Sequence, residues 1–335
     1  MDDWIKRKIR LEEDKELTRE ALETYQRDKL IETIKMAKEN SPFYREHLKD
    51  VNVEEIKEIS DIERLPFLEV KDVRENGLRM LCTRQNDISR IVTQQTSGTT
   101  GESKKIYFTE EDQELTIDFF HHGMRYIVNE EDVVLILMSS NTPGSLGTLL
   151  HEGIERLGAR AILYGMPDDF GKISKVMADE GVTSIVGLPF QTLQLAQFCE
   201  GMQDINIKTV LLSADYVPDS LCRLLEKIWG CKVFEHYGMT ETGLGGSVSC
   251  GELRGMHPRE ADLYFEIIDP KTGDKPKDGE FGEIVITTLT RKGMPFIRYK
   301  TGDYSRWLAE PCPCGTVLKS IDKVRPRTQI KNKRI

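Results

Sequence analysis

Three segments of the chain combine glycine with residues that bind phosphates, metal ions or sugar hydroxyls. The first is Thr96-Ser97-Gly98-Thr99-Thr100-Gly101-Glu102-Ser103-Lys104. Its glycines let the backbone approach a phosphate closely, and its hydroxyls, N–H groups and lysine can bind the phosphate oxygens. The spacing of a Walker A loop is absent. The alternative interpretation is an ordinary surface loop rich in serine, threonine and glycine.

The second segment, residues 236–243, directly follows the apolar run 232–235. Ligands bind α/β folds at the carboxyl edge of the sheet, so Glu241 could hold Mg²⁺ there and Thr240 could contact a phosphate. In the third segment, residues 298–303, a turn at a strand end would present Asp303 to the two hydroxyls of a ribose. Taken alone, each of these two segments is also explained by a solvated turn.

Two pairs of soft metal ligands lie far apart in the sequence. Cys250 and His257 form one pair, and Cys312 and Cys314 flank a single proline. This layout is typical of a structural Zn²⁺ site, because four protein ligands leave no open position for catalysis. The alternative is free thiols and an unrelated histidine in a reducing compartment.

The composition limits the class of protein. The chain has 335 residues, a formal net charge of −9, 39% hydrophobic and 31% charged residues. Its apolar runs are too short to span a bilayer, and an acidic chain is a poor candidate for nucleic-acid binding. The first residues lead into a charged helix, so no signal peptide is predicted. We therefore expect a cytoplasmic globular protein without a membrane or nucleic-acid partner; its oligomeric state stays open.

The pattern of apolar runs predicts an α/β fold. Residues 1–50 are expected to be helical, with a stop at 40–42. Strand-like runs then alternate with helix-like segments, which is typical of mainly parallel sheets covered by helices. The predicted strands are 133–138, 161–164, 183–188, 210–213 and 232–235, and the helices 146–157, 171–180, 190–199 and 220–229. An antiparallel β region is predicted at 263–268, 282–289 and 295–299.

In this order, the three glycine-bearing segments resemble the adenylate-forming superfamily, and most closely its phenylacetate–CoA ligase branch. Segments 41–45, 65–67, 267–273 and 282–285 also resemble that branch, so the likeness covers most of residues 20–327. It implies an AMP-forming acid-activating ligase, in which ATP and a carboxylic acid give an acyl-adenylate and pyrophosphate and the acyl group passes to CoA. It also implies an N-terminal helical segment (1–90), a nucleotide- and acyl-binding core (91–245), a β-rich subdomain (246–327) and a tail (328–335).

The resemblance implies roles for individual residues. Lys104, Thr240 and Glu241 would be catalytic, with Thr240 at the α-phosphate and Glu241 on Mg²⁺. Tyr237 would stack on adenine, Asp303 would bind the ribose, and Arg327 would belong to the hinge. The remaining ATP-binding residues would be Thr96, Ser97, Gly98, Thr99, Thr100, Gly101, Ser213, Ala214, Asp215, His236 and Gly238. The acyl pocket would be lined by Ser139, Ser140, Asn141, Gly144, His236 and Gly243, and the likeness favours an aromatic acid. The branch also carries similar Cys/His positions.

Two departures from the family shape the alternatives. The hinge segment reads Arg325-Pro326-Arg327-Thr328-Gln329, without the usual glycine and carboxylates, and the sequence ends at Ile335. The small C-terminal lid domain is therefore expected to be absent. Two alternatives follow: the acyl group passes to a carrier or partner protein, with a separate lid protein completing the site, or the chain is a lid-less nucleotide- or acyl-binding protein. Glu241, Asp303 and the 96–104 loop favour an enzyme.

Overall fold

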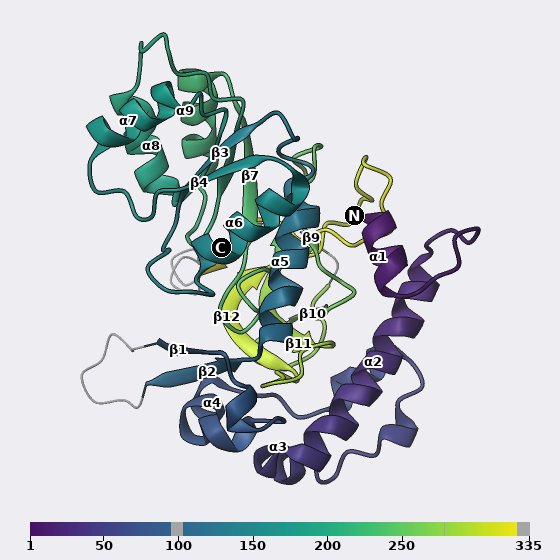
Figure 1. Ribbon diagram of the computed structural model, residues 1–335. Helices are drawn as coiled ribbons and strands as arrows, with labels where there is room; N and C mark the ends of the chain where they lie inside the picture. Colours follow the sequence, from purple (N-terminus) through teal and green to yellow (C-terminus); the bar gives the residue numbers. More distant parts are fainter. Residues whose placement is uncertain (95–102, 278, 327–335) are drawn as a thin grey trace.

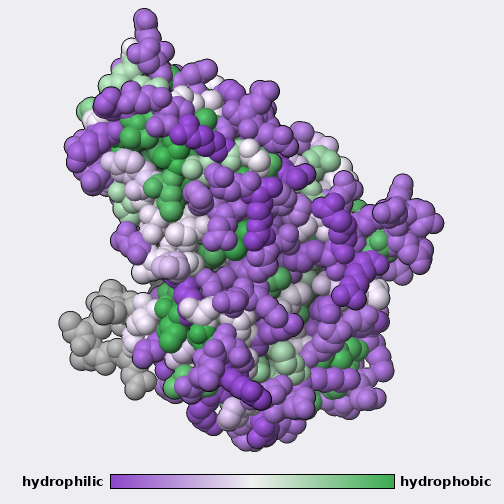
Figure 2. Space-filling view, in the orientation of Figure 1, coloured by the Kyte–Doolittle hydropathy of each residue, from purple (hydrophilic) through white to green (hydrophobic). Residues whose placement is uncertain are grey.

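The computed structural model describes residues 1–94, 103–277 and 279–326 (Figure 1). The predicted phosphate-loop residues Thr96, Ser97, Gly98, Thr99, Thr100 and Gly101, and the predicted hinge residue Arg327, lie outside these ranges. Among the described helices, none is both long and apolar enough to cross a membrane. The face shown in Figure 2 is largely hydrophilic, with separate apolar patches in both its upper and its lower part.

A seven-stranded sheet forms the upper part of the molecule in Figure 1, in the order β4-β3-β5-β6-β7-β8-β9. Strands β3 to β7 run parallel, as predicted, and β8 and β9 extend the sheet antiparallel. The strands are β3 (Val133–Leu137), β4 (Arg160–Leu163), β5 (Ser184–Gly187), β6 (Thr209–Leu212), β7 (Lys232–Tyr237), β8 (Ser247–Val248) and β9 (His257–Pro258). The helices between them are α6 (Leu146–Leu157), α7 (Phe170–Asp179), α8 (Pro189–Phe198) and α9 (Asp219–Trp229).

The apolar runs form parallel strands because both faces of the sheet are covered. In β3, Val134 and Ile136 join a core with α5 (Glu110–Met124) and α6, whereas Leu135 and Leu137 join a second core with α7, α8 and α9. A strand buried on both sides has no polar face, which explains its continuous apolar sequence. The α/β prediction is thereby confirmed.

The antiparallel sheet has the order β10-β11-β12-β13. Its strands are β10 (Leu263–Ile268), β11 (Gly282–Thr288), β12 (Tyr299–Ser305) and β13 (Arg325–Pro326). The predicted strand at 295–299 is wrong, because β12 begins only at Tyr299. Arg298 has a φ of 52°, which interrupts the extended backbone after a buried apolar run. Burial, not strand pairing, explains that run.

Asp303 lies within β12, not at a strand end. Glu283 pairs with Tyr304 and Val285 with Lys300, so β12 carries extra residues in a bulge at 301–303. Gly302 adopts a φ of 79° there, a conformation that favours glycine. The expectation of a turn after a strand is therefore corrected: a bulge inside the strand displays the carboxylate.

The N-terminal half contributes a helical layer and a hairpin. The helices are α1 (Asp2–Lys8), α2 (Arg19–Asn40), α3 (Pro42–His47) and α4 (Val70–Asn76), with short 3₁₀ helices η1 (Val53–Glu55), η2 (Ile59–Arg64), η3 (Gly77–Met80) and η4 (Gln85–Asp87). Ser41 ends α2 and caps α3, where Pro42 occupies the first turn. The hairpin β1 (Arg90–Gln94) and β2 (Lys104–Phe108) was not predicted from the sequence, nor was α5, which Thr109 and Asp112 begin with a capping box.

Candidate functional site

A cavity of about 240 Å³ lies where β6 and β7 end and β12 passes nearby. Ala214 and Asp215 follow β6, His236 and Tyr237 end β7, and Asp303 comes from the bulge in β12. The carboxyl ends of neighbouring parallel strands meet at one edge of a sheet, which is the usual ligand-binding edge. The structure thus brings together residues from three of the predicted segments, with Gly238 in the same lining.

Tyr237 and Asp303 are joined across this cavity. The Tyr237 hydroxyl donates a hydrogen bond of 3.1 Å to Oδ2 of Asp303. Burial raises the pKa of the Asp303 carboxyl, with Tyr237 opposing the rise and Glu241 adding to it. Burial and the neighbouring Asp303 raise the pKa of Tyr237 well above its usual value. The tyrosine therefore stays protonated and holds the carboxylate in place.

His236 is buried and neutral at physiological pH. Burial, with the nearby Arg259 guanidinium, lowers the pKa of His236 to about 3. Its Nδ1 lies 2.7 Å from Oγ of Ser213, and its Nε2 has no hydrogen-bond partner among the described residues. The rings of Phe119 and Phe120 lie 6.0 and 5.7 Å from the imidazole ring. The spare ring nitrogen can serve a ligand's polar atom at the boundary between the cavity and α5.

Glu241 is the centre of a second polar cluster. Its carboxylate is fully buried, and Oε1 receives the Lys104 ammonium and a hydrogen bond of 2.7 Å from the Tyr299 hydroxyl. Oε2 has no hydrogen-bond partner among the described residues. A buried carboxylate oxygen without a partner is costly, and a hard cation such as Mg²⁺ prefers this type of ligand. The donor set therefore fits the predicted metal.

Lys104 lies where the predicted phosphate loop ends and β2 begins. It is the first residue of β2, and its side chain is 11% exposed against Glu241. On the other strand of the hairpin, Gln94 Nε2 lies 2.5 Å from Oγ1 of Thr240. Both ends of the predicted phosphate loop are thus fixed on Thr240 and Glu241, although the loop itself lies outside the described residues.

Two arginines that the sequence analysis missed hold the backbone of this segment. Arg291 donates to the carbonyls of Glu241 (3.1 Å) and Tyr107 (2.8 Å), and Arg259 donates to those of Thr242 and Leu115. Burial lowers the pKa of Arg291 to about 10, so it remains charged. Each arginine has a charged neighbour in the sequence, Lys292 beside Arg291 and Glu260 beside Arg259, and no local pattern shows that it is buried.

The predicted acyl-pocket residues are only partly brought together. Gly144 and Gly243 line a narrow space with Arg90, Gln113 and Thr116, of which the last three were not predicted. Ser139, Ser140 and Asn141 line neither this space nor the 240 Å³ cavity, and Ser139 and Asn141 are exposed. Recognising α5 from its capping box and its helical spacing of apolar residues could have revealed Gln113 and Thr116.

The four predicted zinc ligands converge from segments far apart in sequence. The ligand atoms of Cys250, His257, Cys312 and Cys314 all lie within 4.8 Å of one another. Nδ1 of His257 lies 3.1 Å from the Lys319 carbonyl oxygen and 3.2 Å from Ser320 Oγ, so donation to the carbonyl leaves Nε2 free as a ligand. Three cysteine sulfurs and one histidine nitrogen at this separation fit a tetrahedral Zn²⁺.

Comparison with known proteins identifies the family. The family model described as AMP-binding enzyme matches residues 16–290. The chain belongs to the AMP-binding enzyme family. The matched segment of this AMP-binding enzyme contains Lys104, Thr240 and Glu241, whereas Asp303, Cys312 and Cys314 lie beyond it.

Three relatives of this AMP-binding enzyme carry the same name. Phenylacetate-coenzyme A ligases of Pseudomonas putida, Thermus thermophilus and Escherichia coli are 29%, 26% and 27% identical to it. The alignments cover 86%, 93% and 92% of this chain and 67%, 72% and 71% of the relatives.

Solved structures show the same fold. A 2-hydroxyisobutyryl-CoA ligase in complex with 2-HIB-AMP and CoA superposes with a TM-score of 0.80 at 20% identity, covering 92% of this chain and 70% of that one. ATP-bound MatB from Rhodopseudomonas palustris gives a TM-score of 0.51 at 19% identity over 72% of this chain and 49% of its own. At these identities the likeness establishes the fold alone.

Proposed function

We propose that the chain activates a carboxylic acid with ATP and transfers the acyl group to CoA. The observation that carries this proposal is the adjacency of two features: the cavity held by Tyr237 and Asp303, and the buried carboxylate of Glu241 with one oxygen to spare. A nucleoside fits the first feature and a phosphate-bound cation fits the second. The names of the curated relatives support CoA as the acyl acceptor.

In the first step, a carboxylate oxygen of the acid attacks the α-phosphorus of ATP and the bond to pyrophosphate breaks. Asp303 would accept both ribose hydroxyls, and the ring of Tyr237 would lie against adenine while its hydroxyl orients Asp303. Thr240 and Lys104 would bind phosphate oxygens, with Lys104 leaving Glu241 to do so. Bound Mg²⁺, held by Glu241, would supply neutralisation of phosphate charge. Catalysis then rests on positioning and electrostatics, without a covalent protein intermediate.

In the second step, the CoA thiolate attacks the acyl carbon and AMP leaves. Gly144, Gly243, Arg90 and Gln113 are our candidates for the wall of the acyl site. They pack against one another in this structure, so an acyl group would have to move the Arg90 or Gln113 side chain aside. An aromatic acid stays a proposal based on the relatives' names. Transfer to a carrier or partner protein, and completion of the site by a separate lid protein, stay predictions from the sequence.

The test is acid-dependent exchange of labelled pyrophosphate into ATP, with Mg²⁺, over aromatic, arylacetic and short aliphatic acids. Exchange that requires one class of acid would support adenylation and name the substrate class. Addition of CoA should then release AMP and form the thioester. Tight ATP binding without exchange for any acid would contradict the proposed first step.

We also propose that Cys250, His257, Cys312 and Cys314 hold a structural Zn²⁺. Two of the donors come from the antiparallel end of the seven-stranded sheet, at β8 and β9, and two from the segment after β12, so the ion would join these two parts. Metal analysis of the purified protein should find about one zinc per chain, as a closed four-ligand site implies. Zinc-free protein with unchanged thermal stability would contradict the proposal.

A further inference from the structure

One lysine links two segments that line the 240 Å³ cavity from different parts of the chain. Residues 214–217, which follow β6, form one of these segments, and Val324 with Pro326, at β13, forms the other. Lys323 directly precedes Val324 in the chain, but it does not line the cavity itself. A role for this lysine would therefore be carried by the segments that it joins.

The ammonium of Lys323 contacts three oxygens. It lies 2.8 Å from Oδ1 of Asp219, the first residue of α9, and 2.6 Å from Oε1 of Glu235 in β7. It also donates a hydrogen bond of 3.2 Å to the carbonyl of Val217. An ammonium has three N–H donors, so all of them can be used here. We call this arrangement the Lys323 bridge.

The Lys323 bridge is partly shielded from water. The side chains of Lys323 and Glu235 are 23% and 17% exposed. Burial opposes the charge of Lys323, but the hydrogen bonds to Asp219 and Glu235 outweigh this effect and raise the pKa of the lysine. Burial raises the pKa of Glu235, and Lys323 opposes that rise. The lysine is therefore charged at neutral pH, and salt screens its ion pair less than it would an exposed pair.

The same short segment also pairs with the bulge that displays Asp303. In β13, Pro326 pairs with Asp303 and Arg325 pairs with Tyr304. Among the described residues, Lys323 makes the hydrogen bonds and ion pairs that join residues 322–326 to residues 213–219. The bridge therefore fixes β13, and through it the surroundings of Asp303, relative to the loop after β6.

We propose that Lys323 is a positioning residue that sets the width of the nucleoside cavity. This inference rests on the proposed function, in which the cavity takes the adenosine part of ATP. A wall that is fixed before the ligand arrives needs no ordering on binding, so it supports a higher affinity than a mobile wall. Lys323 contributes to this affinity without touching the ligand.

The test measures adenosine binding to the full chain by calorimetry, well below the melting temperature of each variant. Lys323→Met keeps an unbranched apolar side chain and removes the ammonium. We expect it to weaken adenosine binding by about tenfold, because the cavity wall must then be ordered when the ligand binds. Lys323→Arg should stay within about threefold of wild type, because its guanidinium keeps the charge and can still reach both carboxylates.

A matched control separates positioning of the cavity wall from general stability. Lys8 is also an ammonium between two carboxylates, those of Asp118 and Asp262, and its side chain is 16% exposed. It lies in α1 and does not line the cavity. Lys8→Met should also lower the melting temperature, but its adenosine affinity should stay within about twofold of wild type, because the two lysines share no partner.

A milder variant tests the same bridge if Lys323→Met fails to fold. Asp219 is 68% exposed, so Asp219→Asn should leave the fold intact and weaken adenosine binding by about threefold, as expected for the loss of an exposed ion pair. Unchanged affinity in Lys323→Met or in Asp219→Asn would overturn the positioning role, as would equal weakening in Lys323→Met and Lys8→Met. A wild-type chain that does not bind adenosine would overturn the proposed nucleoside site, and this inference with it.

Discussion

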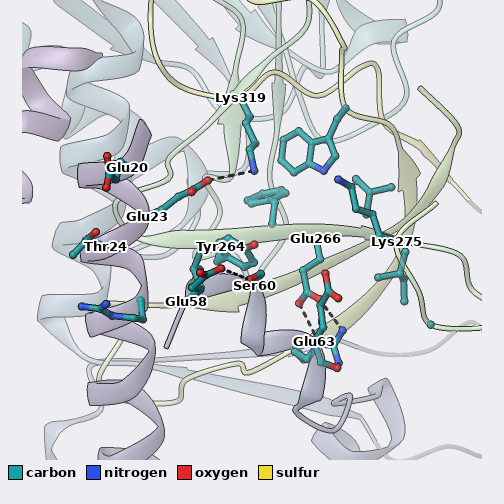
Figure 3. Close-up of a pocket in the computed structure, with 18 of the residues that line it drawn as sticks. Glu20, Glu23, Thr24, Glu58, Ser60, Glu63, Tyr264, Glu266, Lys275 and Lys319 are labelled. Carbon is teal, nitrogen blue, oxygen red and sulfur yellow. Dashed lines mark hydrogen bonds and ion pairs between the residues drawn. The ribbon is translucent and has the colours of Figure 1, made fainter. Parts of the chain in front are cut away.

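Two buried glutamates differ in how completely their oxygens are satisfied. Glu266 in β10 (labelled in Figure 3) accepts hydrogen bonds from Nε and Nη2 of Arg298, and both of its oxygens are engaged. The remaining Nη1 of Arg298 donates to the carbonyls of Glu63 and Leu65. This pair is saturated and joins η2 to the antiparallel sheet.

Glu241 is also buried, but only one of its two carboxylate oxygens has hydrogen-bond partners among the described residues. Lys104 and Tyr299 both reach Oε1, and Oε2 has no partner among the described residues. The two sites are neighbours in the chain, because Arg298 and Tyr299 are consecutive. The comparison teaches that a saturated buried carboxylate stabilises the fold, whereas one with an open oxygen is available to a ligand. The predictions below test this distinction.

The largest effect on stability is expected for Arg298→Met. Glu266 would keep its burial and lose its guanidinium, which typically costs about 3–5 kcal/mol when one partner of a buried pair is removed. Thermal and denaturant unfolding would measure the loss. The double variant Glu266→Met, Arg298→Met should recover part of it, because no buried charge is left alone. Equal stability of wild type and the single variant would contradict the claim that the Glu266–Arg298 pair stabilises the fold.

The largest effect on activity is expected for Glu241→Gln. The amide keeps an oxygen for Lys104 and Tyr299 but loses the negative charge that would hold Mg²⁺. Pyrophosphate exchange should fall by about 100-fold or more, in line with the loss of a group that positions charge in the transition state. The melting temperature should fall less than in Arg298→Met, because the long Lys104 side chain, 11% exposed, can reorient. A large fall in melting temperature with pyrophosphate exchange retained would mean that Glu241 serves the fold and not the ligand.

The Cys/His cluster should behave like the saturated pair. Cys312→Ser with Cys314→Ser should remove zinc and lower the melting temperature, because metal binding contributes directly to folding. Cys82→Ser is the matched control, since Cys82 lies outside the cluster. Adenosine binding should persist in both variants below their melting temperatures. Retention of zinc after loss of both thiols would show that other ligands hold it.

A smaller effect, on adenosine binding, is expected at Asp303. This residue extends the comparison to a third carboxylate, which is partly buried. Its pKa is raised by burial, so it takes up a proton at a higher pH than an ordinary aspartate. Adenosine binding should weaken as the pH falls from neutral to mildly acidic, because the protonated carboxyl accepts fewer hydrogen bonds. Asp303→Asn should weaken adenosine binding by about tenfold at neutral pH. Binding to this variant should no longer weaken as the pH falls. Calorimetry at a series of pH values measures the affinity and its pH dependence. If binding to Asp303→Asn still weakened at acidic pH, a group other than Asp303 would be responsible for the pH dependence.

Tyr237→Phe should have the smallest effect. The ring remains against the cavity, and only the hydrogen bond to Asp303 is lost. Adenosine affinity should fall by about fivefold, because the hydroxyl acts on the ligand only by orienting the Asp303 carboxylate. The same calorimetric titration applies, and a loss as large as that of Asp303→Asn would mean that the hydroxyl contacts the ligand directly.

The parallel sheet could be predicted closely from the sequence, because strands covered on both faces leave continuous apolar runs. β3 and α6 are clear examples, and their predicted ends agree with the structure within one residue. The third antiparallel strand could not be placed in this way. Residues 295–298 are buried without strand pairing, and the bulge at Asp303 depends on pairing with β11.

The candidate site was predictable where a local motif carries the chemistry, as in residues 236–241. It was not predictable where the partner is distant and has no motif. Arg291 reaches the Glu241 carbonyl only through the tertiary fold, and the Lys104–Glu241 pair joins residues 137 positions apart. The zinc ligands could be suggested from residue type, but their approach within 4.8 Å required the structure.

The most direct test compares Glu241→Gln with Glu266→Gln in one assay of Mg²⁺-dependent, acid-dependent pyrophosphate exchange, below the melting temperature of both. Each variant replaces a buried carboxylate by its amide. Our account predicts that exchange is lost in Glu241→Gln and retained in Glu266→Gln. Retained exchange in Glu241→Gln, or equal loss in both variants, would contradict the claim that the open oxygen of Glu241 marks the active site.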